Sequence, residues 1–105
     1  MELDSLHTIN NVEKSRFELA VGEHTAFIDY KIGKSGNWYL IHTEVPADIE
    51  LKGVGRKIVK ESLDILDEQG VQIIPSCPFV KAFIKRNWGD YGHLVIDGYK
   101  MDDNG

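Results

Sequence analysis

Three strand-like segments joined by short turns constrain the fold of this chain more than any other feature. They span residues 16–21, 24–32 and 37–45, and glycine-containing turns connect them at 22–23 and 33–36. In the first two segments apolar residues occupy alternate positions, which is typical of half-buried strands, and such short connections favour hairpins. We therefore predict three consecutive antiparallel strands.

The chain then changes to helical spacing. Pro46 ends the third strand because it cannot donate to a sheet ladder, and Gly70 stands where a left-handed residue would end a helix. The apolar positions between them are Val54, Ile58, Val59, Leu63 and Leu66. This spacing predicts a helix over residues 54–69.

Shorter elements follow this helix. The apolar run at 71–75 predicts a buried strand, and Pro78 suits the first position of a second helix. One face of that second helix would carry Phe79, Ala82, Phe83 and Arg86. A last strand is predicted at residues 93–97.

This order of elements predicts an α/β (α+β) fold, in which a mixed, mostly antiparallel sheet packs against two main helices. The chain has 105 residues, of which 42% are hydrophobic and 28% are charged. Such a chain suits a single domain, residues 1–105, and the predicted elements place its core at about residues 12–97.

Composition and charge narrow the classes of function. One cysteine cannot form an internal disulfide, no apolar run approaches the length of about 20 residues that a membrane helix needs, and the N-terminus lacks a signal-peptide layout. We expect a cytoplasmic protein without a membrane partner. The formal net charge of −5 argues against nucleic acid as a partner but permits a local anion site. The oligomeric state stays open, a monomer included.

An anion site is predicted in the stretch ELKGVGRK, residues 50–57. Gly53 and Gly55 let a ligand approach the backbone, where the first amides of the following helix carry the positive end of its dipole. The cations around this point are Lys52, Arg56 and Lys57. An ordinary helix start with solvated basic residues remains the alternative.

Three stretches of the chain, in their order and spacing, resemble the YjdJ-like branch of the GNAT acetyltransferase superfamily. They are HTEVP (42–46), KGVGRKIVKESLD (52–64) and IIPSCPFVKAFIKR (73–86). The resemblance covers most of residues 12–91, and the Cys-Pro-Phe-Val element is its most specific part. It implies an N-terminally shortened GNAT-like acyl-CoA N-acyltransferase fold. It also implies an enzyme that transfers an acetyl group from acetyl-CoA to an unidentified amine of a small molecule or protein.

The resemblance further implies where acetyl-CoA binds. The pantetheine arm would lie between the strand that ends at Val45 and the next strand, and the pyrophosphate would lie on the loop at 52–57. The residues that the resemblance places at the coenzyme are Val45, Lys52, Gly53, Val54, Gly55, Arg56, Lys57, Pro78, Phe79, Ala82 and Arg86.

Three features depart from the pattern of this branch. Glu50 stands where the loop usually begins with Gln or Arg, Leu51 stands where the branch commonly has glycine, and the ending RNWGDY (86–91) differs from a His-Pro-Glu-Tyr-like ending. A carboxylate beside a pyrophosphate disfavours binding by on the order of 1 kcal/mol unless it turns away. Glu50 and the shortened fold favour an alternative function, a non-catalytic acyl-CoA-binding sensor or interaction module.

Cys77 is the candidate catalytic thiol. Pro78 holds it in an extended conformation just before a helix, where the dipole and the free amides favour a thiolate. Cys77 would be the acid that protonates the departing coenzyme thiolate, or a nucleophile that carries the acetyl group as a thioester. Two alternatives stay open: a buried cysteine that only packs, and a redox thiol, for which the chain has no resolving cysteine.

His42 and Glu44 are the candidate base and its supporting or substrate-binding carboxylate. They lie two residues apart on one strand, so their side chains share a face. An acceptor amine must lose a proton before it attacks, which a histidine can accept near neutral pH. The alternative for His42 is a polar residue at a sheet edge. No metal site is expected, because no histidine has ligand spacing around Cys77.

Overall fold

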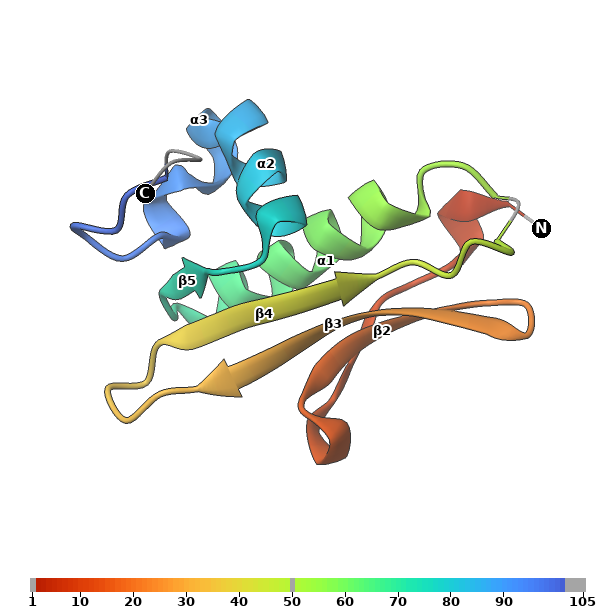
Figure 1. Ribbon diagram of the computed structural model, residues 1–105, viewed down its shortest axis with the longest axis horizontal. Coiled ribbons are helices and arrows are strands. Elements are labelled where there is room, and N and C mark those ends of the chain that lie inside the picture. Colours follow the sequence, from red (N-terminus) through yellow and green to blue (C-terminus); the bar gives the residue numbers. More distant parts are fainter. Residues whose placement is uncertain (1, 50, 102–105) are drawn as a thin grey trace.

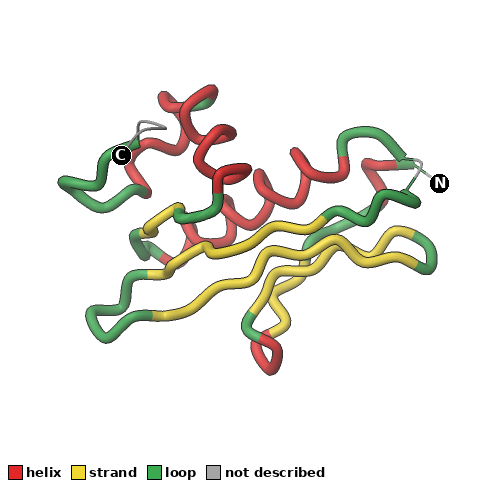
Figure 2. The backbone as a smooth tube through the Cα atoms, viewed as in Figure 1, coloured by secondary structure: helices red, strands yellow, loops and turns green. Residues whose placement is uncertain are grey.

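The computed structural model describes residues 2–49 and 51–101. Within them, five strands form one sheet in the order β1-β2-β3-β4-β5 (Figures 1 and 2). The strands are β1 (Ile9–Asn11), β2 (Arg16–Val21), β3 (His24–Ile32), β4 (Trp38–Glu44) and β5 (Ile73–Pro75). The pairings from β1 to β4 are antiparallel, and β4 pairs with β5 in parallel. The predicted mixed, mostly antiparallel sheet is confirmed.

The alternation in β2 and β3 decides which face of the sheet is buried. Phe17 lies opposite Ile28 and Leu19 lies opposite Ala26, and all four side chains are fully buried. Burial contributes on the order of 1.5–3 kcal/mol for each large side chain among them. Ile32 has the same parity but ends β3 in an exposed position. The inner face of the sheet therefore carries the core, and its outer face carries the polar residues in between.

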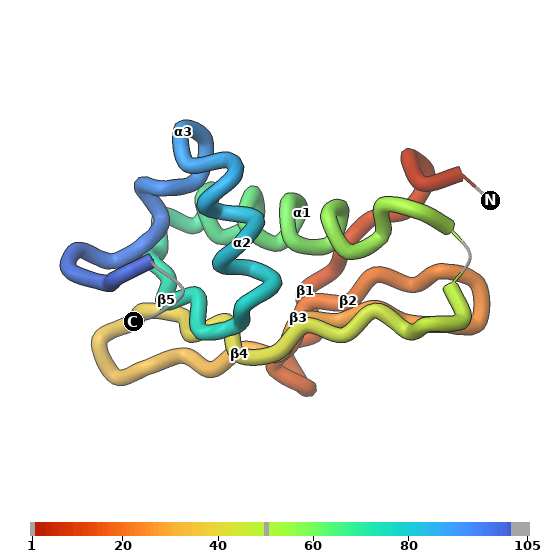
Figure 3. Tube along the Cα trace, turned by 45° about the horizontal axis from the view of Figure 1, so that its top comes forward, coloured from red at the N-terminus to blue at the C-terminus, as the bar shows by residue number. Residues whose placement is uncertain are grey.

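The helices cover this inner face (Figures 1 and 3). Those described are α1 (Val54–Gln69), α2 (Pro78–Arg86) and the short α3 (Trp88–Tyr91), with 3₁₀ turns η1 (Leu3–Ser5), η2 (Val12–Lys14) and η3 (Gly92–Leu94). Helix α1 has the predicted bounds, and Gly70 ends it with φ at +70° while its N–H bonds to the carbonyl of Asp67. Among the described residues, no helix is both long enough and apolar enough to cross a membrane.

Two predicted strands differ from the structure. The one at 71–75 begins only at Ile73, because the Val71 N–H still bonds to the Leu66 carbonyl at the end of α1. The strand predicted at 93–97 is wrong. Residues 92–94 form η3, and a turn begins at Ile96, whose carbonyl accepts from the Tyr99 N–H. Between them Val95 forms an isolated parallel bridge with Ile73, and the Ile96 N–H donates to the Ile73 carbonyl at 3.1 Å. The flanking turns leave too little extended chain for a strand.

The N-terminal segment adds structure that the sequence did not predict. Strand β1 pairs with β2, and the Asn10 side chain accepts a hydrogen bond of 2.6 Å from the Tyr30 hydroxyl. Thr8 donates both its N–H and its hydroxyl to the Glu61 carboxylate on α1. These contacts connect segments that are distant in sequence, and they attach the first residues to both the sheet and α1.

A β-bulge in β4 changes which side chains face the helices. Asp29 lies opposite His42 and Tyr30 lies opposite Leu40, so Ile41 is an extra residue on β4. Before the bulge, Leu40 is fully buried. After it, Thr43 lies opposite the buried Ile28 and so faces inward, whereas His42 faces outward.

Candidate functional site

The candidate site lies where β4 and β5 separate. Their pairing ends at Leu40 and Pro75. Beyond this point the Cys77 N–H bonds to the Leu40 carbonyl at 2.9 Å, and the chain turns away into α2. Strand β4 continues to Glu44 alongside the N-terminal ends of α1 and α2 (Figure 1). The site is therefore built from one strand end and two helix starts.

Three residues predicted at the coenzyme meet here. An added Cβ on Gly55 would lie 2.7 Å from Phe79 Cζ and 3.5 Å from Val45 Cγ2. The Phe79 ring thus lies directly against the backbone of α1, and a larger residue at position 55 would require the ring to move. The Phe79 side chain is nevertheless 43% exposed, so its ring is accessible from solvent.

The start of α1 supplies unpaired backbone donors. Gly53 caps the helix with φ at +87°, and no side chain caps it. The N–H groups at the first helical positions, residues 54–56, have no acceptor within the helix, so they and the helix dipole favour an anion. Val54 is buried in the core and can offer only its backbone. Glu50 lies outside the described residues.

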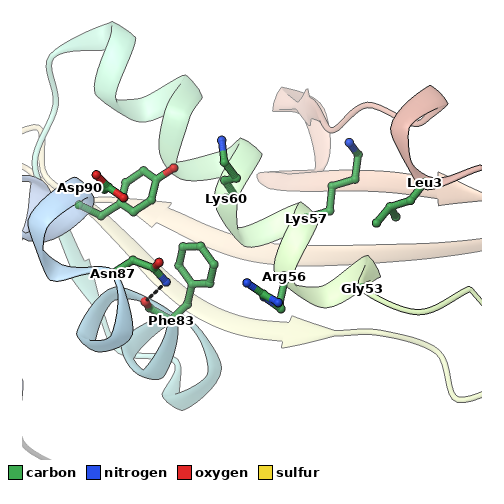
Figure 4. A pocket seen from close by; sticks show the side chains of 9 residues that line it. Leu3, Gly53, Arg56, Lys57, Lys60, Phe83, Asn87 and Asp90 are labelled. Carbon is green, nitrogen blue, oxygen red and sulfur yellow. Dashed lines mark hydrogen bonds between the residues drawn. The ribbon is translucent and has the colours of Figure 1, made fainter.

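A cavity of about 340 Å³ opens beside these donors, between α1 and the α2–α3 segment (Figure 4). Its lining residues are Leu3, Gly53, Arg56, Lys57, Lys60, Phe83, Asn87, Asp90 and Tyr91. Arg56 is exposed and has no ion pair or hydrogen bond with any described residue, whereas Lys57 pairs with Glu61 at 3.5 Å. Sequence reasoning missed Lys60, although it lies one helical turn from Arg56 and so on the same face of α1.

The far wall of the cavity is a fixed hydrogen-bond network. The Tyr91 hydroxyl donates to Asp64 Oδ1 at 2.7 Å, and Lys60 Nζ donates to Asp64 Oδ2 at 2.8 Å. Burial and the hydrogen bond to Asp64 raise the pKa of Tyr91 to about 12, so the phenol stays protonated at neutral pH. Asp64 offsets the charge of Lys60, which leaves Arg56 as the cation best placed to meet a ligand.

Cys77 lies at the inner side of the site. It is the N-cap of α2 and is 4% exposed. Its thiol makes no hydrogen bond to the start of the helix and instead donates to Thr43 Oγ1 at 3.2 Å. Sequence reasoning missed Thr43, because strict alternation along β4 would have turned it outward.

His42 and Glu44 lie together on the outer face of the sheet. Their side chains are 57% and 56% exposed, and His42 Nε2 is 3.8 Å from Glu44 Oε1. The His42 ring also packs edge-on against Phe27, with centroids 6.2 Å apart. The structure therefore brings His42 to Glu44 but places Cys77 on the opposite face of the sheet.

The other predicted residues lie at varied distances from this centre. Lys52 is exposed on the loop, Pro78 begins α2 beside Phe79, and Ala82 is half-buried one turn further on. Arg86 is exposed at the far end of α2, about 10 Å from Phe79 at 1.5 Å per residue. Among residues 2–49 and 51–101, no group of three or more potential ligands could hold a metal ion.

Comparison with known proteins identifies the family. A family model for the GCN5-related N-acetyl-transferases matches residues 16–94, from the first residue of β2 to the end of η3. A search of curated proteins found no match. The matched segment contains the β4–β5 separation, Gly53 and Gly55 at the start of α1, and Cys77, and the family supports a general acetyltransferase function. The chain therefore belongs to the GCN5-related N-acetyltransferase family.

Proposed function

We propose that this protein transfers an acetyl group from acetyl-CoA to an amine, with assistance from Cys77. One observation carries the proposal: Val45, Gly55 and Phe79 converge where β4 leaves β5, beside the free amides of α1. A close approach to backbone at a helix start suits a phosphorylated ligand. The Cys-Pro-Phe-Val element also leads us to place the chain in the YjdJ-like branch, as a cytoplasmic enzyme.

The coenzyme fits the site in three parts. Its pyrophosphate binds the amides of residues 54–56 and Arg56, and its phosphorylated nucleotide end extends toward the cavity at Lys57. The pantetheine amides bond to β4 beyond Leu40, where pairing with β5 has ended. The thioester sulfur then lies near Cys77 on the inner side, and we place its carbonyl carbon in the opening beyond Leu40, where β4 no longer pairs with β5 and an amine on the outer face can reach it. Lys52, Pro78 and Ala82 flank this path.

In this mechanism His42 and Cys77 act from opposite faces of the sheet. On the outer face, His42 accepts the proton of the acceptor ammonium, and Glu44 stabilises the imidazolium. The freed amine attacks the thioester carbonyl, the carbon–sulfur bond breaks, and the coenzyme leaves as a thiolate. The acylated nitrogen loses its second proton to solvent. On the inner face, Cys77 gives that thiolate its proton, and solvent later returns a proton to Cys77. In the other form of the mechanism, Cys77 first accepts the acetyl group as a thioester and the amine then attacks it.

Binding is tested first, with the intact protein and acetyl-CoA. A ligand that binds only the folded state raises the free energy of unfolding by about 2.7 kcal/mol at one hundred times its dissociation constant, so we expect a higher thermal midpoint. No shift at millimolar acetyl-CoA would rule out the site. If acetyl-CoA binds but substitution of Arg56 does not change its affinity, the pyrophosphate binds elsewhere.

Catalysis is then tested by release of free coenzyme thiol with polyamines, aminoglycosides, amino acids and lysine peptides. Intact-mass spectrometry shows whether an acetyl group remains on Cys77. This result distinguishes the mechanism in which Cys77 carries the acetyl group from the one in which it only donates a proton. A His42→Ala variant should bind acetyl-CoA normally and turn over about a hundredfold more slowly, the usual scale for one acid or base. Binding without thiol release for every acceptor would instead favour the non-catalytic acyl-CoA-binding module.

A further inference from the structure

We propose that Thr43 is a positioning residue for Cys77, a role that rests on the acetyl transfer proposed above. The Cys77 thiol donates to Thr43 Oγ1 at 3.2 Å, across 34 positions in the sequence. This hydrogen bond links β4 to the start of α2 at the point where β4 and β5 separate. It therefore lies on the side of the sheet where the thioester is proposed to bind.

The bulge at Ile41 brings Thr43 to this position. Leu40 and His42 would share a face in a regular strand. The extra residue shifts the alternation by one, so Thr43 lies opposite the buried Ile28 and faces the helices. Thr43 is also β-branched, which restricts its χ1 and keeps the hydroxyl in a narrow range of directions.

The backbone of Cys77 is fixed, but its side chain depends on Thr43. The Cys77 N–H bonds to the Leu40 carbonyl, and the Cys77 carbonyl accepts from the Lys81 N–H, both at 2.9 Å. The thiol does not cap α2, so its own helix does not orient it. The Thr43 hydroxyl therefore determines where the thiol proton points.

A hydroxyl suits both protonation states of the thiol. Thr43 Oγ1 accepts from Cys77 while the S–H is intact, and its own O–H can rotate to donate to the sulfur after that proton has gone to the coenzyme thiolate. If Cys77 is instead the acetyl carrier, the same donation holds the thiolate before it attacks the carbonyl carbon. Thr43 takes part in no bond change, so its effect passes entirely through Cys77.

The test compares Thr43→Val, which keeps the shape and removes the hydroxyl, with Thr43→Ser, which keeps the hydroxyl. Cys77 is the only cysteine, so alkylation by iodoacetamide, followed by intact-mass spectrometry, reports on this thiol alone. We expect alkylation to slow by about tenfold in Thr43→Val, the scale of one hydrogen bond to a charged group, and to recover in Thr43→Ser. Thr43→Ala gives a second hydroxyl-free variant if the valine variant does not fold.

Turnover gives the second readout. The kcat of Thr43→Val should fall by about tenfold while the KM for acetyl-CoA stays unchanged, because only the thiol is affected. Alkylation that is unchanged or faster in both hydroxyl-free variants would overturn the role of Thr43, even in an active enzyme. A wild type that releases no coenzyme thiol but shows the expected alkylation pattern would refute the acetyl transfer while supporting the orientation of Cys77 by Thr43.

Discussion

Replacing Gly55 with alanine tests the contact on which the proposed site depends. The new Cβ would lie 2.7 Å from Phe79 Cζ, so the ring has to move. Overpacking costs about 1–3 kcal/mol, whereas replacing glycine with alanine within a helix gains up to about 1 kcal/mol. Because Phe79 is 43% exposed, its ring can turn toward solvent. We therefore expect a cost of about 2 kcal/mol, below the upper end of the range, and a net loss of about 1 kcal/mol in the free energy of unfolding.

The sign of this effect should reverse when the ring is absent. In a Phe79→Ala background nothing obstructs the new methyl group on that side, so Gly55→Ala should stabilise the fold by up to about 1 kcal/mol. The coupling energy between the two substitutions is then about 1–2 kcal/mol. Urea denaturation of all four proteins, followed by far-ultraviolet circular dichroism, measures it.

Gly89 provides the matched control. It lies in α3, and an added Cβ there would have no neighbour within 4 Å. Gly89→Ala should therefore change stability by the same amount whether or not Phe79 is present. If Gly55→Ala also has one effect in both backgrounds, Phe79 does not lie against Gly55 and our reasoning about the site is refuted. Acetyl-CoA affinity should fall in both Gly55→Ala proteins, because the methyl group blocks approach to the backbone.

Three further predictions concern charge, the thiol and pH. Arg56→Glu should weaken acetyl-CoA binding by roughly tenfold or more at low salt, since it replaces attraction with repulsion at a helix start. The control Lys34→Glu, on the distant β3–β4 hairpin, should not weaken it. Equal affinities of the two variants in titration calorimetry would contradict this prediction. Cys77→Ala should bind acetyl-CoA but turn over about a hundredfold more slowly in the thiol-release assay; wild-type turnover would make Cys77 a packing residue. Tyr91→Phe should lower the free energy of unfolding by about 1 kcal/mol at neutral pH through loss of the bond to Asp64. The folded-state pKa of Tyr91 is raised from 10.0 to about 12, so this stabilisation is complete below pH 10 and is lost as the pH rises toward 12. In urea denaturation, the difference in free energy of unfolding between wild type and Tyr91→Phe should therefore shrink over that interval.

The sequence predicted most of the fold because the main elements carry local signals. Helix α1 was predicted with its bounds, since its apolar spacing is regular and Gly70 marks its end. The strand expected at 93–97 failed for a non-local reason. Apolar residues such as Val95 favour a strand. The number of residues that can pair with β5, however, depends on where the preceding α3 and η3 end and in which direction the chain then runs. Strand β1 was missed because three residues carry too little pattern to detect.

The resemblance predicted a set of coenzyme residues from the sequence, and the structure showed which of these residues lie in contact. Gly53 and Gly55 were visible as a helix-start pair, but the contact of Gly55 with Phe79 depends on how α2 packs against α1. The cavity beside Arg56 was also outside the reach of sequence reasoning, because its opposite wall comes from α2 and α3. Such walls depend on tertiary packing, which local spacing does not encode.

The sequence by itself determined that Cys77 stands between a strand and a helix and that His42 and Glu44 share a face. Only the tertiary structure decided which of these residues meet. In a regular strand successive side chains alternate between the two faces, which would place His42 on the same side as the buried Leu40. This alternation holds only while each residue of β4 has one partner on β3. The bulge at Ile41 breaks that count, so Thr43 contacts Cys77 while His42 faces the opposite side of the sheet.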